Sequence, residues 1–248
     1  MTVWHERGGA GDPVVLLHSS VADSGMWDAQ WEPLTACFDV VRMDFRGHGR
    51  TPYASEGPYS DAGDVASLLA ALDLRSVALV GSSYGGRVAL ELATEHPDLV
   101  SQLALLNAGC GLPPTPDLTE FDAEEERLID AGDLDGAVAL NVRTWLGPSA
   151  DDATRTRLAA MQRHAFEMQL AAVSEPDKRR APIDLAVIGA PTLVVTGAHD
   201  LPYFRESGRH MADTMPLAAL FEFDWAGHLP SLERPDEVTS LLLSFLPC

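Results

Sequence analysis

Short apolar segments alternate with amphipathic ones along most of the chain. Six runs rich in β-branched and other apolar residues are expected to be strands: 13–19, 38–45, 76–82, 103–109, 192–197 and 219–225. The runs in the middle of the chain are apolar on both faces, as in a parallel sheet that helices cover on both sides. Segments with helical periodicity lie between the strands, at 28–36, 61–73, 84–95 and 235–246. This alternation predicts an α/β fold with right-handed crossovers.

The alternation stops between residues 112 and 188. Prolines open this region, an acidic helical segment follows, and residues 151–173 form a second long helical pattern. No strand pattern returns before residue 192. We therefore predict a core of residues 1–111 and 189–248, and a helical lid of residues 112–188 inserted between two strands. The alternative is an ordinary crossover connection with several helices, but a crossover does not explain why the insertion is so long.

Composition and charge restrict the partners and the compartment. With 46% hydrophobic and 22% charged residues, a chain of 248 residues can bury a sizeable core. The formal net charge of −20 argues against nucleic acid or an anionic membrane as a partner, since both attract basic surfaces. The three cysteines, Cys37, Cys110 and Cys248, are too sparse for a disulfide framework. No apolar run approaches the roughly 18 residues of a membrane span. The sequence therefore predicts a soluble cytoplasmic protein.

Two adjacent serines lie at a predicted strand-to-helix turn in residues 77–93, VALVGSSYGGRVALELA. This is the context of a Gly-x-Ser-x-Gly nucleophile elbow, in which the serine has a strained backbone with positive φ. Strand and helix approach closely there, so the residues two before and two after the nucleophile must be small. Around Ser83 these residues are Gly81 and Gly85, whereas Ser82 has larger side chains at both places. The pattern predicts Ser83 as the nucleophile.

A serine nucleophile needs a neighbouring base, and the base needs an acid that orients it. His228 lies in the loop after the last predicted strand, and Asp200 follows the strand at 192–197. Both therefore belong to strand ends, which open onto the functional edge of an α/β sheet. The order Ser83, Asp200, His228 is that of one triad arrangement. His18 and His48 also follow strands and could line the site, but neither has a carboxylate placed to orient it.

Two other polar residues near strand ends compete with Asp200 for the role of the acid. Asp224 is close to His228 in sequence, but we expect it to support the loop instead. Asn107 ends the strand after the nucleophile helix, which is another common place for the acid. A neutral amide cannot stabilise an imidazolium ion, so Asn107 strengthens the prediction of Asp200.

Acyl transfer also requires donors for the developing oxyanion. The backbone N–H of Tyr84 directly follows the nucleophile at a helix N-terminus, where amide groups are free. We expect it to be one donor. The second donor should come from the loop after the strand at 14–18, which has the sequence HSSVADSGMW.

The chain resembles the α/β-hydrolase superfamily over nearly its whole length. Five segments occur in the family's order and spacing: VVLLHSS, VVRMDFRGHGRT, VGSSYGGRVALELA, LVVTGAHD and AGHLPSLERPDEV. They look most like the compact lidded branch with 3-oxoadipate enol-lactonase, small esterases, carbon–carbon bond hydrolases and cofactor-free haloperoxidases. The resemblance implies the α/β-hydrolase fold, with a mostly parallel sheet, helices on both faces and an inserted helical lid. It also implies triad roles for Ser83, Asp200 and His228, and gives the second oxyanion amide to Ser20.

The sequence departs from the family's pattern in two places. The family usually has His-Gly in the first loop, and this chain has His18-Ser19. Either the serine is tolerated without effect, or the hydroxyl of Ser19 or Ser20 contacts the substrate. The start is also short, because residues 3–9 look like one strand and the usual first antiparallel strand is missing.

The resemblance and the predicted triad imply a serine hydrolase that cleaves a carboxylic ester or lactone of a small, largely apolar substrate through an acyl-enzyme. A carbon–carbon bond hydrolase of a diketone and a ligand receptor with an intact triad are the alternatives. No metal or organic cofactor is implied, and the oligomeric state is not readable. Ser19, Asn107 and Trp145 are candidates to line the substrate pocket. The acidic run 122–126 is more typical of a solvated helix face than of a cation site.

Overall fold

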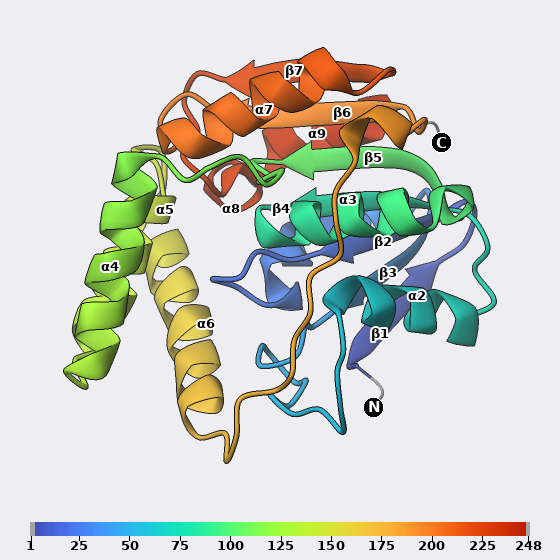
Figure 1. The fold of residues 1–248 in the computed structure, drawn as a ribbon. Coiled ribbons are helices and arrows are strands. Elements are labelled where there is room, and N and C mark those ends of the chain that lie inside the picture. The colour runs from blue at the N-terminus through green and yellow to red at the C-terminus, as the bar shows by residue number, and fades with distance from the viewer. Residues whose placement is uncertain (1–2, 247–248) are drawn as a thin grey trace.

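The computed structural model describes residues 3–246 and contains one twisted seven-stranded sheet over that range (Figure 1). Its strand order is β1-β3-β2-β4-β5-β6-β7. The strands are β1 (His5–Gly9), β2 (Pro13–Leu17), β3 (Asp39–Met43), β4 (Val77–Ser82), β5 (Val100–Leu106), β6 (Thr192–Gly197) and β7 (Ala218–Phe223). Only β1 is antiparallel to its neighbour among these strands, and it pairs with β3 at the edge. The predicted α/β fold with a mostly parallel sheet is confirmed.

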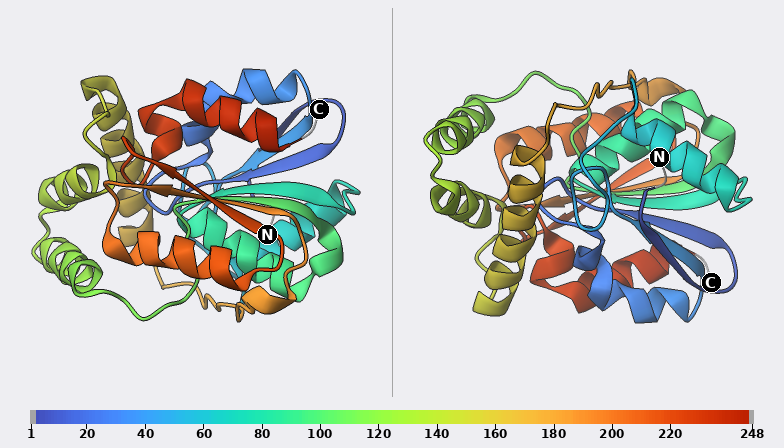
Figure 2. Two further views of the ribbon diagram at one scale, coloured as in Figure 1. Left: turned by 90° about the horizontal axis from the view of Figure 1, so that it is seen from above. Right: turned by 90° about the horizontal axis from the view of Figure 1, so that it is seen from below.

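Helices cover both faces of the sheet, as Figure 2 shows from above and below. They are α1 (Asp28–Thr35), α2 (Asp61–Ala71), α3 (Tyr84–Glu95), α7 (Pro202–Thr214), α8 (Pro230–Glu233) and α9 (Pro235–Phe245). α2, α3 and α7 lie on one face, and α1, α8 and α9 lie on the other (Figures 1 and 2). Strand β4 is buried along its whole length, and alternate side chains join the apolar clusters on the two faces. This two-sided burial explains the continuous apolar runs in the sequence.

Three helices, α4 (Pro116–Asp130), α5 (Leu134–Trp145) and α6 (Asp152–Leu170), stand beyond the carboxyl ends of the strands (Figure 1). The chain then returns along residues 171–184, outside the body of the sheet, before β6 begins (Figure 1). These helices come from the predicted insertion 112–188, and they lie on the side of the molecule where the strand-end loops gather. The insertion is therefore placed to cover a site at those loops.

Three α-helices of the described residues, α5, α7 and the four-residue α8, were not predicted from the sequence. α5 is short and contains Gly136 in its first turn, which weakens its helical pattern. α7 buries Phe204, Ser207, Gly208 and Met211, so its inner face has no continuous apolar stripe. At the N-terminus β1 is one antiparallel strand at the edge, in agreement with the short start.

The described residues contain no helix that is long and apolar enough to cross a membrane. Cys37 and Cys110 are free thiols, and Cys248 lies outside the described residues.

Candidate active site

Ser83 occupies a sharp turn between β4 and α3. Its backbone has φ 51° and ψ −112°, which is an unusual conformation for a residue with a side chain. The turn is tight enough that a Cβ atom on Gly81 would lie 2.6 Å from the carbonyl carbon of Gly85 and 2.6 Å from the Cα of Gly86. Ser82 is instead the last residue of β4, with its side chain fully buried. The elbow geometry predicted for Ser83 is therefore present in this structure.

We expect Gly81→Ala to lower the free energy of unfolding by about 3 kcal/mol, since the new methyl group meets backbone atoms that cannot rotate away. Chemical denaturation of the purified protein measures this loss. Gly189→Ala is the matched control, because a Cβ at Gly189 meets no atom within 4 Å. Equal stability of the two variants would contradict the close approach of strand and helix.

The structure brings Ser83, His228 and Asp200 together at the ends of β4, β7 and β6. The Oγ of Ser83 lies 2.7 Å from Nε2 of His228, and Nδ1 of His228 lies 2.7 Å from Oδ2 of Asp200. All three residues are buried, with exposed fractions of 6%, 2% and 6% for Ser83, His228 and Asp200. His199 is exposed while its neighbour Asp200 is buried. The arrangement allows the imidazole to accept the serine proton at Nε2 while its Nδ1–H donates to a carboxylate.

The side chain of Asn107 orients the carboxylate of Asp200 by a hydrogen bond. Its Nδ2 donates to Oδ2 of Asp200 at 2.6 Å and to the carbonyl oxygen of Gly227 at 3.0 Å, and the Leu201 amide donates to Oδ1 of Asp200 at 2.7 Å. Asn107 has no exposed surface and does not line the cavity, so the prediction that it contacts the substrate is wrong. An amide at this position orients the acid of the adjacent strand because it can donate where a carboxylate cannot.

Two aromatic rings and one backbone hydrogen bond hold His228 in position. The ring centroid lies 4.7 Å from that of Trp145 and 4.1 Å from that of Phe204. The His228 amide donates to the carbonyl oxygen of Trp145 at 3.0 Å, which ties the histidine loop to the end of α5. The preceding Gly227 amide lies 3.0 and 3.1 Å from the two carboxylate oxygens of Glu233, which is buried.

Glu233 therefore supports the histidine loop, and the prediction that Asp224 does so is wrong, because Asp224 is exposed. Burial raises the pKa of the Glu233 carboxyl. No pattern in the sequence indicates this role, since Glu233 lies in a helix four residues long after the loop.

The loop after β2 faces Ser83 across the site. His18 accepts a hydrogen bond from the Phe45 amide at Nε2, 2.9 Å away, so its Nδ1 carries the proton and donates to the carbonyl oxygen of Ser19 at 2.7 Å. The carbonyl group of Ser19 and the N–H of Ser20 belong to the same trans peptide unit, in which the two groups point in opposite directions. The hydrogen bond from His18 to this carbonyl oxygen therefore turns the Ser20 N–H away from His18. Ser20 lines the cavity together with Ser83 and Tyr84. Tyr84 is the first residue of α3, so its amide has no partner in a preceding turn of the helix.

His18 and His48 have a structural role in this loop. The two ring nitrogens of His48 lie 2.9 Å from the Ser20 carbonyl oxygen and 3.1 Å from the Arg46 carbonyl oxygen. Burial, and then the neighbouring His18, lower the pKa of His48 to about 4, and burial also lowers the pKa of His18. Both rings are therefore neutral near pH 7 and are engaged with backbone groups. This explains why neither competes with His228 as the base for Ser83.

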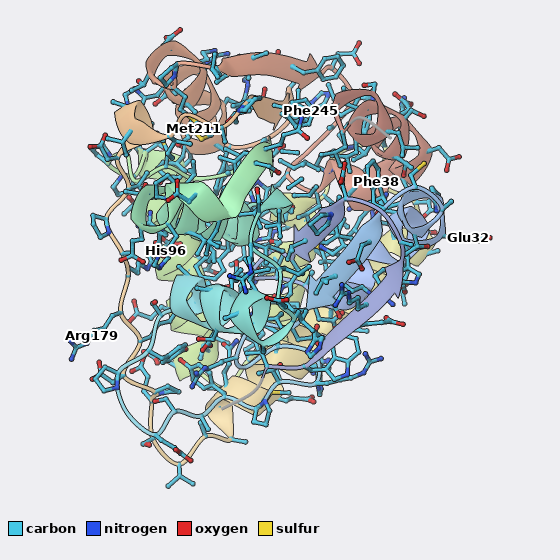
Figure 3. All side chains as sticks on the ribbon, turned by 90° about the vertical axis from the view of Figure 1, so that its right-hand side faces the viewer. Glu32, Phe38, His96, Arg179, Met211 and Phe245 are labelled. Carbon is cyan, nitrogen blue, oxygen red and sulfur yellow. The ribbon has the colours of Figure 1, made fainter. Side chains whose placement is uncertain are left out.

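The side chain of Tyr84 is anchored away from Ser83. Its hydroxyl donates to Asp61, which is 2% exposed and whose Oδ2 lies 2.6 Å from Nζ of Lys178. Burial raises the pKa of the Tyr84 hydroxyl, which stays protonated as a donor. Lys178 belongs to the returning segment after α6, whose neighbour Arg179 projects from the surface in Figure 3. The ion pair therefore ties the returning segment to the residue that follows the elbow serine.

A cavity of about 400 Å³ opens above Ser83 and His228 beneath α4, α5 and α6. Trp145, Phe204 and Phe121 form an aromatic wall, and Ser19 also lines the cavity, as predicted for Trp145 and Ser19. The Ser19 hydroxyl is buried and has no hydrogen-bond partner within residues 3–246, and the backbone φ of Ser19 is not positive. A glycine is therefore not required at this position. The lining is mixed rather than wholly apolar, whereas the substrate expected from the sequence is largely apolar.

No group of three or more His, Cys, Asp or Glu side chains within residues 3–246 is arranged to hold a metal ion.

Comparison with known proteins gives a consistent result. The model of the alpha/beta hydrolase family matches residues 14–241. The chain is 31% identical to the pimeloyl-[acyl-carrier protein] methyl ester esterase of Chromobacterium violaceum, over 99% of this chain and 98% of that one. It is 30% identical to a Caulobacter sp. (strain K31) protein named "Putative carbamate hydrolase RutD", over 94% of this chain and 90% of that one. The solved structure of Est816, described as an N-acyl homoserine lactone degrading enzyme, is 28% identical with a TM-score of 0.80, covering 98% of this chain and 96% of that chain.

Proposed function

The chain belongs to the alpha/beta hydrolase family, and from this membership we propose that it is a serine hydrolase that cleaves a carboxylic ester or lactone through an acyl-enzyme. The observation that carries the proposal is the 2.7 Å contact between the Ser83 hydroxyl and Nε2 of His228, at the floor of a cavity. Relatives named as an ester hydrolase and a lactone-degrading enzyme support the two substrate classes.

In the first step His228 takes the proton of Ser83 at Nε2, and the serine oxygen attacks the substrate carbonyl. Asp200 accepts the hydrogen bond from Nδ1–H, keeps the ring in the required tautomer and stabilises the imidazolium ion that forms. The burial of the three side chains matters because charge interactions are stronger where water is excluded.

The negative charge that develops on the carbonyl oxygen requires two donors. We assign them to the amides of Ser20 and Tyr84, two residues that line the cavity together with Ser83. Each donor of this kind lowers the barrier by roughly 3 kcal/mol. The leaving group then departs with the proton from His228, and the acyl group stays on Ser83.

Deacylation repeats these steps with water as the nucleophile. His228 accepts a proton from the water as the water oxygen attacks the acyl carbonyl, and then returns the proton to Ser83 as the serine oxygen leaves. The products are the carboxylic acid and the alcohol, or the hydroxy acid when the substrate is a lactone. The protein ends in its starting protonation state.

His18→Ala is expected to lower kcat by roughly ten- to a hundredfold, since the peptide that presents the Ser20 amide loses the hydrogen bond at its carbonyl group. KM should change less than kcat, because an oxyanion donor acts mainly in the transition state. Steady-state kinetics with an aryl ester measure the two constants. His96→Ala, at an exposed helix end, is the control. A His18→Ala variant with wild-type kcat would contradict the assignment of Ser20.

The test of the proposed function is a panel of aryl esters, lactones and vinylogous diketones with the wild-type protein and the Ser83→Ala variant. We expect multiple turnover of esters or lactones by the wild type only. Cleavage of diketones alone would assign the protein to carbon–carbon bond hydrolysis. Binding of small ligands without turnover of any of these compounds would favour a receptor.

A further inference from the structure

The end of the cavity formed by the lid helices carries polar groups that the proposed hydrolysis does not use. Asp122 and Glu125 on α4 and Gln162 on α6 line it, whereas the neighbouring Glu124 and Glu126 do not. The acidic run 122–126 is thus only partly the solvated helix face that its sequence predicts.

Glu125 is held in place by a chain of buried contacts that starts at the proposed catalytic histidine. The ring of Trp145 lies against that of His228, and its Nε1–H donates to Oδ1 of Asn141 at 2.8 Å. Nδ2 of Asn141, which has no exposed surface, donates to Oε1 of Glu125 at 2.5 Å and to the Ala137 carbonyl oxygen at 3.0 Å. Asn141 therefore links the Trp145 ring to the Glu125 carboxylate and holds that carboxylate in place.

The carboxylates of Glu125 and Asp122 have no cationic partner among the described residues. No Lys, Arg or His side chain of residues 3–246 forms an ion pair with either of them. Burial raises the pKa of the Glu125 carboxyl, and nearby Asp122 raises it further. A partly buried carboxylate without a partner gains from a cation that enters the cavity.

Gln162 adds a polar side chain to the same end of the cavity. It is 4% exposed and lines the cavity, and its side-chain oxygen has no hydrogen-bond donor within the described residues. Gln162, Phe166 and Gln169 follow one another at spacings of four and three residues, so they share the α6 face toward the cavity. Buried polar atoms are rarely left unpaired, and an amide oxygen accepts but does not donate. The oxygen is itself buried, so it is not the atom that Gln162 presents to the cavity.

Cations also line the cavity, on the wall next to α3. Arg87 is paired there with buried Glu91 at 3.0 Å, and Arg180 is exposed in the returning segment. Glu91 neutralises Arg87, and solvent screens the charge of the exposed Arg180, so this wall is less suited to an anion than the half-buried Glu125 carboxylate is to a cation. Phe121 and Trp145, whose ring centroids are 4.6 Å apart, add aromatic surface beside the two carboxylates. Aromatic rings and carboxylates together favour an ammonium group.

We propose that the lid end of the cavity binds a protonated amine of the substrate, so that the protein prefers esters or lactones whose distal end is an ammonium group. The half-buried carboxylate of Glu125 and the exposed carboxylate of Asp122 supply the negative charge at this end of the cavity. The proposal rests on the proposed hydrolase function and names its substrate class.

The test compares 4-nitrophenyl esters of equal chain length that differ in their distal group. The 6-aminohexanoate ester carries an ammonium group, the heptanoate ester a methyl group, and the adipate monoester a carboxylate. We expect kcat/KM for the 6-aminohexanoate ester to exceed that for the heptanoate ester by about tenfold, with the adipate ester the poorest. Equal values, or preference for the neutral or anionic ester, would overturn the proposal.

Glu125→Gln should bring the ratio of kcat/KM for the ammonium and methyl esters close to one, because the amide can still accept from Asn141 but has no charge. The ratio is independent of the amount of active protein. Glu126→Gln on the same helix is exposed and lies off the cavity, and it should keep the wild-type ratio. A ratio that stays at the wild-type value in Glu125→Gln would also overturn the proposal.

A binding measurement separates this proposal from the proposed function. Titration calorimetry with hexylammonium and with hexanoate, on the Ser83→Ala variant, requires no turnover. We expect hexylammonium to bind more tightly than hexanoate, and Glu125→Gln in this background to weaken it. If no ester is cleaved but this binding pattern holds, hydrolysis fails and the amine site stands. If esters are cleaved without preference and hexylammonium does not bind, the amine site alone fails.

Discussion

Replacement of Ser83 by alanine is expected to lower kcat by a factor of about 10⁵ or more, since the substrate carbonyl loses its nucleophile while the base and the oxyanion donors remain. The fold should be unaffected, because alanine has the same backbone requirements at the elbow and removes one hydroxyl group. Steady-state kinetics with an aryl ester, together with a thermal unfolding curve, measure both expectations.

The neighbouring serine provides the matched control. Ser82 is fully buried at the end of β4, and its hydroxyl has no hydrogen-bond partner among the described residues. Ser82→Ala should therefore retain activity, since it removes a hydroxyl that contacts no reacting group. A Ser82→Ala variant that is as inactive as Ser83→Ala, or a Ser83→Ala variant that keeps activity, would contradict the choice between the two serines.

Replacement of Asp200 by asparagine is expected to lower kcat by about 10⁴-fold. The carboxylate accepts hydrogen bonds from three groups, which are the His228 ring, the Asn107 amide and the Leu201 backbone. An asparagine has only one oxygen, so its NH₂ group must face at least one of these donors. In every orientation the imidazolium ion loses its stabilising charge, and with the NH₂ group toward Nδ1 the ring also loses the partner that fixes its tautomer.

Asp224→Asn is the control for this variant, because it makes the same chemical change at an exposed position near the histidine loop. It should have kcat close to that of the wild type. A kcat for Asp200→Asn within about tenfold of the wild-type value would show that the acid lies elsewhere, as would a large loss in Asp224→Asn.

The elbow and the three residues that meet there could be predicted because local rules govern them. The small residues around Ser83 follow from the close approach of strand and helix, which the structure shows at Gly81. Asp200 and His228 follow from the rule that the carboxyl ends of parallel strands meet at one edge of a sheet. Neither inference requires knowledge of the packing of the lid.

The roles of Asn107 and Glu233 depend on contacts between distant parts of the chain, and the sequence does not indicate them. Asn107 reaches Asp200, 93 positions further along the chain, and its positive φ of 51° directs it away from the cavity. Glu233 reaches back to the Gly227 amide from a short helix. Such roles depend on side-chain direction, which periodicity does not give.

The lid was the least predictable part for a similar reason. Its composition indicates helices, but composition does not determine which face of each helix lines the cavity. Glu125 and Glu126 are adjacent in an acidic run, and only Glu125 lines the cavity. The difference is set by Asn141 and Trp145 on α5, a helix that the sequence pattern did not predict.

The most direct test of the central claim is to identify the residue that carries the covalent adduct after reaction with an aryl phosphonate, by tandem mass spectrometry. Tryptic cleavage after Arg75 and Arg87 gives a peptide of residues 76–87 that contains both candidate serines. We predict one phosphonyl group per chain, located on Ser83, with loss of esterase activity in the same proportion. An adduct on Ser82 or outside this peptide, or full activity in a protein labelled at Ser83, would contradict the proposed mechanism.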